Sequence, residues 1–158
     1  DIENPSKKIL FALEPIQKLI EMDSEVLEGI RYLHKKLKNK YEFIFRPHPK
    51  DAKNYKKIQN ILEIEKKMLS YNSLDNDLST SKVVISTNSS VLIHASFLNI
   101  YSFQIKEGAV GIFDDIPCYD TKKLFSILNQ IMHKTKKPIN VDYLEDNLDA
   151  LENILFNN

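Results

Sequence analysis

The chain has 158 residues, which is enough for one domain with a hydrophobic core and too few for two. Its 22 basic residues balance 22 acidic ones, so no overall field directs it to nucleic acid or to an anionic membrane surface. A single cysteine, Cys118, excludes an internal disulfide framework, and the sequence has neither a membrane-spanning apolar run nor a signal peptide, so we expect a cytoplasmic protein.

The first half of the sequence alternates between predicted strands and helices. A continuous apolar run over 7–13 predicts a buried strand that ends at Glu14-Pro15. Apolar residues at helical spacing then predict a helix over 24–38, with Ser24 as its N-cap. A second strand is predicted over 41–45 and a second amphipathic helix over 54–66.

The second half repeats this alternation. We predict a weaker strand over 68–71, a short helix over 74–79, a strand over 83–86, a helix capped by Asn88 or Ser89 that ends near 98, a strand over 100–105, a helix over 121–133 capped by Thr121, and a helical tail over 141–156. The predicted fold is therefore α/β, a Rossmann-like doubly wound parallel sheet with its core at about 7–135.

Polar residues follow three of these strands where each strand ends. Glu14 follows the first strand, 46–50 follow the second, and 87–90 follow the strand over 83–86. Ligands of doubly wound folds bind beyond the carboxyl ends of the strands, where the strand order reverses. We therefore expect these three segments to form one site.

The segment Arg46-Pro47-His48-Pro49-Lys50 has the character of an anion site. Two prolines stiffen the backbone on both sides of His48, and Arg46 is one of only two arginines in the chain. A guanidinium and an imidazole suit a phosphate and its departure as a leaving group. A proline-rich strand end with a solvated histidine is the plainer interpretation.

The segment Thr87-Asn88-Ser89-Ser90 joins a buried strand to an apolar helix. Hydroxyls and free amides at a helix start can bind a phosphate. Helix capping explains the same residue types equally simply. The two segments together favour a shared phosphate site.

These two segments resemble the His-Pro and Ser-Ser motifs of bacterial sialyltransferases and polysialyltransferases, which are GT-B enzymes that use CMP-sialic acid. A similar pair of motifs occurs in CDP-glycerol glycerophosphotransferases. The resemblance covers about 7–135 and implies the C-terminal, donor-binding half of an inverting, metal-independent enzyme that makes capsule or lipooligosaccharide. It implies that His48 assists departure of the CMP phosphate, and that Ser89 and Ser90 hold that phosphate. Arg46, Pro49, Lys50, Thr87 and Asn88 would complete the donor site.

The family's general base lies in an acidic motif of its N-terminal domain, and this sequence has no such motif. We expect that acceptor-binding domain to be absent from 1–158, which would leave this single domain inactive alone. The expected partners are a nucleotide-sugar donor and, through the missing domain, a glycan acceptor, without a cofactor; peripheral membrane association of a longer protein stays open.

Several other residues also invite a functional interpretation. Glu14, Glu107 and Gly108 are candidates for contacts with the base or ribose, although turn formation explains them as well. The pair Asp114-Asp115 lacks accompanying ligands, so no metal is expected. Of the other histidines, His34 and His133 are expected at the surface, and His94 is expected to be at least half-buried.

Three alternatives remain open: the donor domain of a glycerophosphotransferase, half of a nucleotide-sugar 2-epimerase, and a non-enzymatic module that binds a nucleotide or phosphosugar. A classical dinucleotide enzyme is excluded because the first predicted strand is not followed by Gly-x-Gly-x-x-Gly. A receiver domain is excluded because its acidic residues are missing.

Overall fold

The computed structural model describes residues 7–22, 24–106, 113 and 115–132. Its centre is a five-stranded parallel sheet with the order β2-β1-β3-β4-β5. The strands are β1 (Lys8–Ala12), β2 (Glu42–Arg46), β3 (Val83–Ser86), β4 (Tyr101–Ile105) and β5 (Cys118–Tyr119). The predicted fold class, a Rossmann-like α/β domain with a doubly wound parallel sheet, is confirmed.

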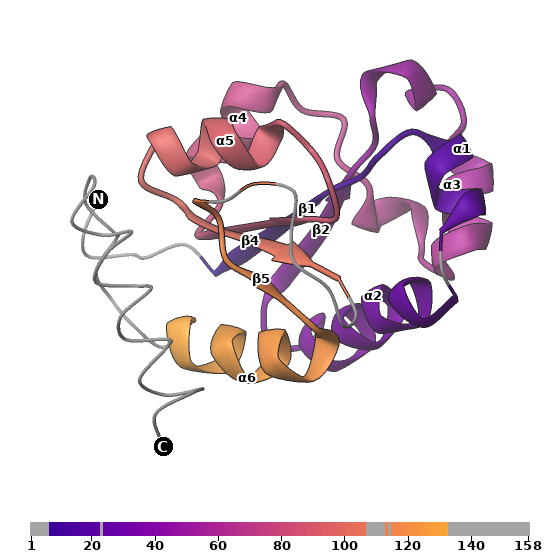
Figure 1. Ribbon diagram of the computed structural model, residues 1–158. Helices are drawn as coiled ribbons and strands as arrows, with labels where there is room; N and C mark the ends of the chain where they lie inside the picture. The colour runs from indigo at the N-terminus through magenta and orange to yellow at the C-terminus, as the bar shows by residue number, and fades with distance from the viewer. Residues whose placement is uncertain (1–6, 23, 107–112, 114, 133–158) are drawn as a thin grey trace.

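Helices cover both faces of the sheet (Figure 1). They are α1 (Ile16–Glu21), α2 (Ser24–Leu37), α3 (Tyr55–Leu62), α4 (Leu74–Thr80), α5 (Val91–Phe97) and α6 (Thr121–Ile131), with single 3-10 turns η1 (Pro49–Asp51) and η2 (Lys66–Met68). Helices α4 and α5 lie on one face, and α2 and α6 lie on the other. None of the helices within the described ranges has the length and apolar character needed to cross a bilayer.

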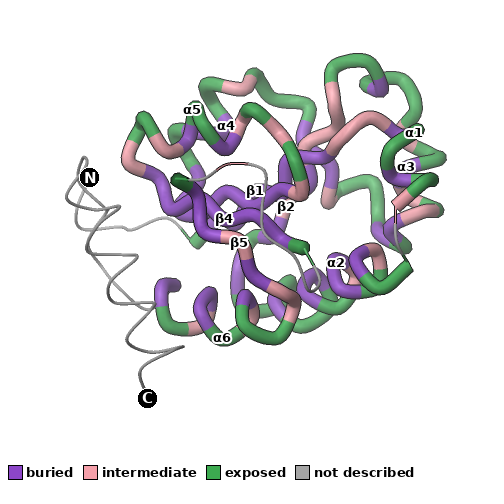
Figure 2. The backbone as a smooth tube through the Cα atoms, in the orientation of Figure 1, coloured by how far each residue is buried: buried purple, intermediate pink, exposed green. Residues whose placement is uncertain are grey.

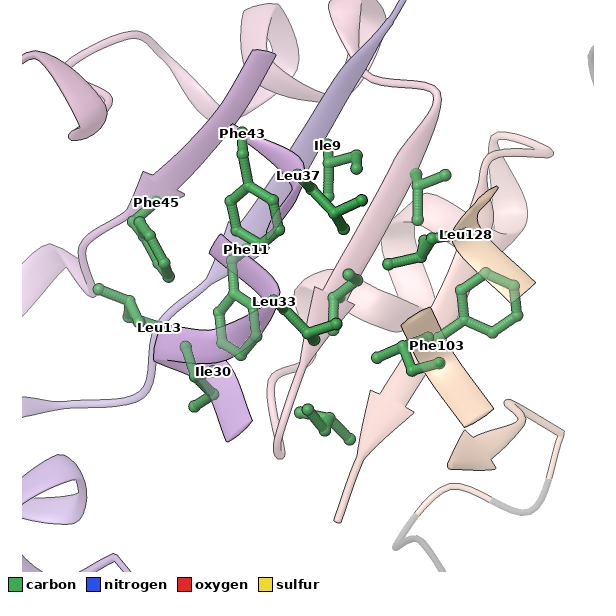
Figure 3. Close-up of a cluster of buried hydrophobic side chains, with 14 of the residues drawn as sticks. Ile9, Phe11, Leu13, Ile30, Leu33, Leu37, Phe43, Phe45, Phe103 and Leu128 are labelled. Carbon is green, nitrogen blue, oxygen red and sulfur yellow. The ribbon is translucent and has the colours of Figure 1, made fainter. Parts of the chain in front are cut away.

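The strand sequences supply both faces with apolar side chains, because successive side chains point in opposite directions. In β1, Ile9 and Phe11 belong to the larger core under α2 and α6, whereas Leu10 belongs to the smaller core under α4 and α5. Figure 2 shows buried residues along the strands and on the inward faces of the helices, and Figure 3 shows part of the larger core.

His34 lies inside this larger core, which contradicts its predicted surface position. It is 3% exposed, and its ring centroid lies 5.4 Å from that of Phe43 and 5.3 Å from that of Phe45. Burial lowers the pKa of His34 from 6.5 to about 4, with a further contribution from Lys38. The prediction for His94 is also wrong, since it is exposed on α5.

The predicted strand over 68–71 is wrong. Leu69 makes one parallel bridge with Phe45, and the chain then leaves the sheet. The side chain of Leu69 is buried, but the next residue, Ser70, donates a hydrogen bond from its hydroxyl to Asp77 of α4. After this bridge the segment therefore turns from strand pairing to a polar contact with α4.

The predicted helix ends differ at four places. Ser24, predicted as an N-cap, is itself the first residue of α2. Helix α3 ends at Leu62 rather than near 66, because Glu63 takes a left-handed conformation that lets Ile64 turn into the core. Helix α5 has Ser90 as its N-cap, not Asn88 or Ser89. Helix α6 is capped by Asp120 rather than Thr121, since its carboxylate accepts the amide of Lys123.

Among the α-helices and strands, two were not predicted, the short helix α1 and the two-residue strand β5. For the backbone, the Glu14-Pro15 pair predicted only the end of a strand, although proline is also suited to the start of a helix. The predicted tail over 141–156, His133, Asp114 and the loop with Glu107 and Gly108 lie outside the described residues.

Candidate functional site

The strand order places the reversal point of the sheet between β1 and β3. From there the chain proceeds outward to β2 on one side and to β4 and β5 on the other. The carboxyl ends of the two central strands carry Glu14 and Thr87, and the Thr87 hydroxyl donates a hydrogen bond to Glu14 Oε2. Two predicted site residues, 73 positions apart in sequence, therefore meet where ligands of such sheets bind.

A cleft of about 360 Å³ opens at this point. It is lined by Glu14, Lys18, Glu21, Met22, Val26, Thr87, Asn88, Ile105 and Lys106. Two carboxylates and two ammonium groups share its wall with an apolar surface. This mixture suits a ligand that combines hydrogen-bond donors with an anionic group.

A second hydrogen bond holds the two central strands together directly beneath this cleft. The buried Ser86 hydroxyl donates to the carbonyl oxygen of Ala12 at 2.6 Å. In the Ser86-Thr87-Asn88-Ser89-Ser90 segment, the hydroxyl of the first serine is thus bonded inside the sheet. The residues that can face a ligand begin at Thr87.

The His48 loop follows β2, on the other side of β1. His48 is extended (φ −61°, ψ 144°), and its Nδ1 accepts the backbone N–H of Lys50 at 3.1 Å. Because Nδ1 accepts, the neutral imidazole carries its hydrogen on Nε2. His48 therefore has a fixed ring orientation with Nε2–H as its remaining donor.

Asp51 connects the His48 loop to the loop after β1. Its buried carboxylate accepts the amide of Ile16, the first residue of α1, at 2.8 Å. The backbone N–H of Asp51 in turn donates to the carbonyl of His48 at 2.8 Å. The loops that carry Glu14 and His48 are therefore fixed relative to each other.

Arg46 points toward α4 and has protein partners. Its Nη1 lies 2.9 Å from Asp77 Oδ2 and 2.7 Å from the carbonyl oxygen of Asn72. Its side chain is 19% exposed. Through Nη1 this guanidinium therefore makes structural contacts, which the sequence motif alone did not predict.

The start of α5 holds the other two predicted phosphate contacts. Ser89 is half-buried, and its hydroxyl accepts the amide of Val91 at 3.2 Å. Ser90 is exposed and makes no side-chain capping bond. The Ser90 hydroxyl is thus not used for capping the helix.

The structure brings the predicted residues to one edge of the sheet in three groups. Glu14, Thr87 and Asn88 line the cleft, whereas the 46–50 segment and Ser89-Ser90 do not. The ends of β2 and β3 lie two strand spacings apart, roughly 10 Å, with β1 between them. Lys50 and Pro49 are exposed there. The roles predicted for these residues stay predictions.

Three residues that the structure links to these segments were not predicted from the sequence: Lys18 in the cleft wall, Asp51 and Asp77. Lys18 belongs to α1, which was not predicted. Asp51 directly follows the motif and could have been flagged as a helix cap. The position of Asp77 depends on tertiary packing, and no local sequence pattern predicts it.

No metal site is evident in the described ranges, where no three His, Cys, Asp or Glu side chains are grouped to hold an ion. Burial raises the pKa of the Cys118 thiol, with Lys106 opposing the shift, which does not favour a nucleophilic thiolate. A larger groove of about 560 Å³ between α2 and α6 includes Tyr32 and Asp120 but none of the predicted site residues.

Comparison with known proteins identifies the fold. No family model and no curated protein matches the sequence. The ADP-heptose LPS heptosyltransferase II of E. coli is similar in structure, with a TM-score of 0.55 and 12% identity over 82% of this chain. A Listeria monocytogenes protein described as a UDP-N-acetylglucosamine 2-epimerase has a TM-score of 0.53 and 11% identity over 99% of the chain.

The wall teichoic acid polymerase TagF is also similar, with a TM-score of 0.53 and 17% identity over 95% of the chain. The chain spans about half the length of the first two proteins, 47% of each, and 39% of TagF. These likenesses confirm the Rossmann-like fold found within GT-B glycosyltransferases. At these identities they establish the fold alone.

Proposed function

We propose that this chain is the donor-binding domain of a GT-B glycosyltransferase and binds a nucleotide sugar at the carboxyl edge of its sheet. The observation that carries the proposal is the Glu14–Thr87 hydrogen bond across the reversal point, in the wall of a cleft. The His48 loop and the start of α5 flank this point. The strand order and the side chains therefore favour the same place for the ligand.

The cleft is suited to the nucleoside. The Glu14 carboxylate can accept hydrogen bonds from ribose hydroxyls or from the exocyclic amino group of cytosine, whereas uracil presents a carbonyl oxygen at that position. The Thr87 hydroxyl already donates to Glu14, so in this arrangement it meets the ligand as an acceptor. This chemistry supports a CMP-linked donor, and the chain's similarity to sialyltransferase motifs points the same way.

The phosphate is assigned to groups that flank the cleft. His48 offers Nε2–H, Lys50 an ammonium group, and Ser89 and Ser90 their hydroxyls. As the bond between the sugar and the phosphate breaks, negative charge grows on the phosphate oxygens. His48 stabilises that charge by donation, without a metal. The reaction proposed is inverting, as in the sialyltransferases that these motifs resemble.

The remaining parts of the enzyme are proposed to lie outside this chain. A second domain would supply the general base and bind a glycan acceptor of the capsule or lipooligosaccharide type. The isolated chain is accordingly expected to bind donor without turnover. We place the full-length protein in the cytoplasm, with peripheral membrane association as an option for the acceptor step.

Nucleotide titration tests this proposal. Isothermal calorimetry with CMP, CDP, UMP and UDP should show the tightest binding for CMP, and His48→Ala and Ser89→Ala should each weaken it by about tenfold. Preference for CDP would favour glycerol phosphate transfer, and preference for a uridine nucleotide would favour an epimerase. Absence of binding to all four nucleotides would refute the proposal.

A matched pair of variants tests the role of Glu14. Glu14→Gln should reduce the preference for CMP over UMP several-fold, because an amide can donate to the uracil carbonyl. Glu21→Gln is the control: Glu21 also lines the cleft, but its carboxylate accepts from Gln17 on the same helix. Equal effects of the two substitutions would remove Glu14 from base recognition.

A further inference from the structure

Asp77 is a fully buried carboxylate that binds two cations. It lies on α4 with 0% exposure, and its Oδ1 is 3.0 Å from Lys8 Nζ while its Oδ2 is 2.9 Å from Arg46 Nη1. Lys8 lies at the start of β1, and Arg46 lies at the end of β2, two residues before His48. Asp77 thus links the phosphate motif to the helix layer above the sheet.

Neutral donors complete the shell around this carboxylate. Ser70 Oγ donates to Oδ2 at 2.6 Å, and Asn72 Nδ2 lies 3.4 Å from Oδ1. The Asn72 carbonyl oxygen accepts from Arg46 Nη1 at 2.7 Å. Burial would by itself raise the pKa of Asp77, but the hydrogen bonds from Ser70, Lys8 and Arg46 lower it, so the group is ionised. Arg46 is therefore held at two points through one nitrogen.

The two cations that contact Asp77 differ in how far a ligand can reach them. In the contacts described, the Asp77 carboxylate faces both the Lys8 ammonium and the Arg46 guanidinium. The Lys8 side chain is 7% exposed and also bonds Thr80, whereas the Arg46 side chain is 19% exposed at the carboxyl edge. A ligand can therefore reach Arg46 more readily than Lys8. Both protein hydrogen bonds described for Arg46 use Nη1, so Nε and Nη2 remain for an anion.

We propose that Asp77 is a positioning residue: it fixes Arg46 so that the rest of the guanidinium binds the donor phosphate beside His48. This inference rests on the proposed function. It explains why the motif's arginine is tied to a buried acid instead of extending freely into solvent. Asp77 itself touches no ligand and acts only through Arg46.

The test compares cytidine with CMP, since the ratio of their dissociation constants isolates the phosphate. In Asp77→Asn and in Arg46→Lys, CMP should lose about tenfold in affinity while cytidine changes less than about twofold, as expected for one charge-assisted bond. Adding Asp77→Asn to Arg46→Lys should cause no further loss, because both substitutions remove the same contact. Asp75→Asn, an exposed acid in the first turn of the same helix, is the matched control.

A milder variant covers the case in which Asp77→Asn does not fold. Ser70→Ala removes the 2.6 Å hydrogen bond to the carboxylate without changing charge, and should lower CMP affinity about threefold with cytidine unchanged. Equal weakening of cytidine and CMP would show a structural role only and overturn the inference. So would unchanged CMP affinity in a folded Asp77→Asn protein. If the unmodified chain binds no nucleotide, the proposed function fails and this inference fails with it.

Discussion

His34 is a titratable side chain enclosed by aromatic rings. Its Nε2 is buried and has no hydrogen-bond partner within the described part of the chain. The packing of its ring against Phe43 and Phe45 favours the neutral form, because an imidazolium would lose its hydration there. The pKa of about 4 in the folded chain compares with 6.5 for an unhindered histidine.

This difference predicts a pH-dependent stability. Between pH 6.5 and 4 the unfolded chain binds a proton at His34 that the folded chain does not, so the stability present above pH 6.5 is lost as the pH falls. The loss should approach about 2 kcal/mol between pH 7.5 and pH 5. His34→Leu should remove it, as measured by urea unfolding at the two pH values. His94→Leu, at an exposed histidine, should leave the loss in place; the same slope in both variants would contradict the assignment.

The two histidines also show what sequence reasoning can decide at the scale of single residues. His34 has lysines beside it in the sequence, which suggested the surface, but its helical position lies on the stripe that faces β2. The sequence predicts where strands end, and these predictions placed Glu14, His48 and Thr87 just after strand ends. Which side chains bond to each other depends on strand order, so neither the Glu14–Thr87 hydrogen bond nor the Arg46–Asp77 ion pair could be predicted from the sequence.

At the scale of elements, α6 depends on the cap provided by Asp120. The carboxylate accepts the Lys123 amide at 2.9 Å at the helix start, where amides have no partner within the helix. Asp120→Ala should lower the free energy of unfolding by about 1 kcal/mol in urea denaturation. The exposed Asp115 is the control, and Asp115→Ala should change the free energy of unfolding by less than about 0.5 kcal/mol. If both variants lose the same free energy of unfolding, the cause is the change in overall charge and not the lost cap.

The end of α3 offers a stabilising substitution. Glu63 adopts φ 56° and ψ 50°, a conformation that glycine takes without the steric cost of a Cβ atom. Its ion pair with Arg31 is 3.1 Å long, but its side chain is 56% exposed, so the pair contributes little. Glu63→Gly should raise the free energy of unfolding by about 0.5–1 kcal/mol in thermal or urea denaturation.

Glu65→Gly is the control for this substitution. Glu65 has φ −82°, where glycine brings no steric relief and only adds freedom to the unfolded chain. It should therefore be neutral or destabilising. A gain at Glu65 as large as that at Glu63 would refute the conformational explanation.

Most helices and strands could be predicted because the apolar residues selected by the periodicity of the sequence are also the residues that are buried. The strands over 83–86 and 100–105 and the helix over 24–38 are examples, since each buries the residues that the pattern selects. The misses share a different cause. The bridge at Leu69, the short α1 and the two-residue β5 depend on partners elsewhere in the chain, such as Phe45, Asp51 and Gln104.

At the scale of the whole molecule, α5 presents apolar side chains outward while the formal net charge is zero. Phe97 is 81% exposed, Leu98 58% and Ile93 37%. A protein without net repulsion and with such a surface tends to associate near neutral pH. Phe97→Asp should therefore reduce the weight-average mass in sedimentation at pH 7 without lowering the melting temperature.

The matched substitution is Ile20→Asp, because Ile20 is 60% exposed but lies on α1, away from this surface. It adds the same charge and should affect association less than Phe97→Asp does. If both substitutions reduce association equally, net charge rather than the α5 surface is responsible.

The first strand of the chain lies in the interior of the sheet, and this has a consequence for biosynthesis. When only β1, α2 and β2 of this domain have been synthesised, one long side of β1 stays unpaired until residues 83–86 emerge. The Ser86 hydroxyl reaches the Ala12 carbonyl, and the Thr87 hydroxyl reaches Glu14, only after that moment. Before β3 has joined, the cleft lined by Glu14 and Thr87 is therefore not formed, and a ligand of this cleft could not assist folding.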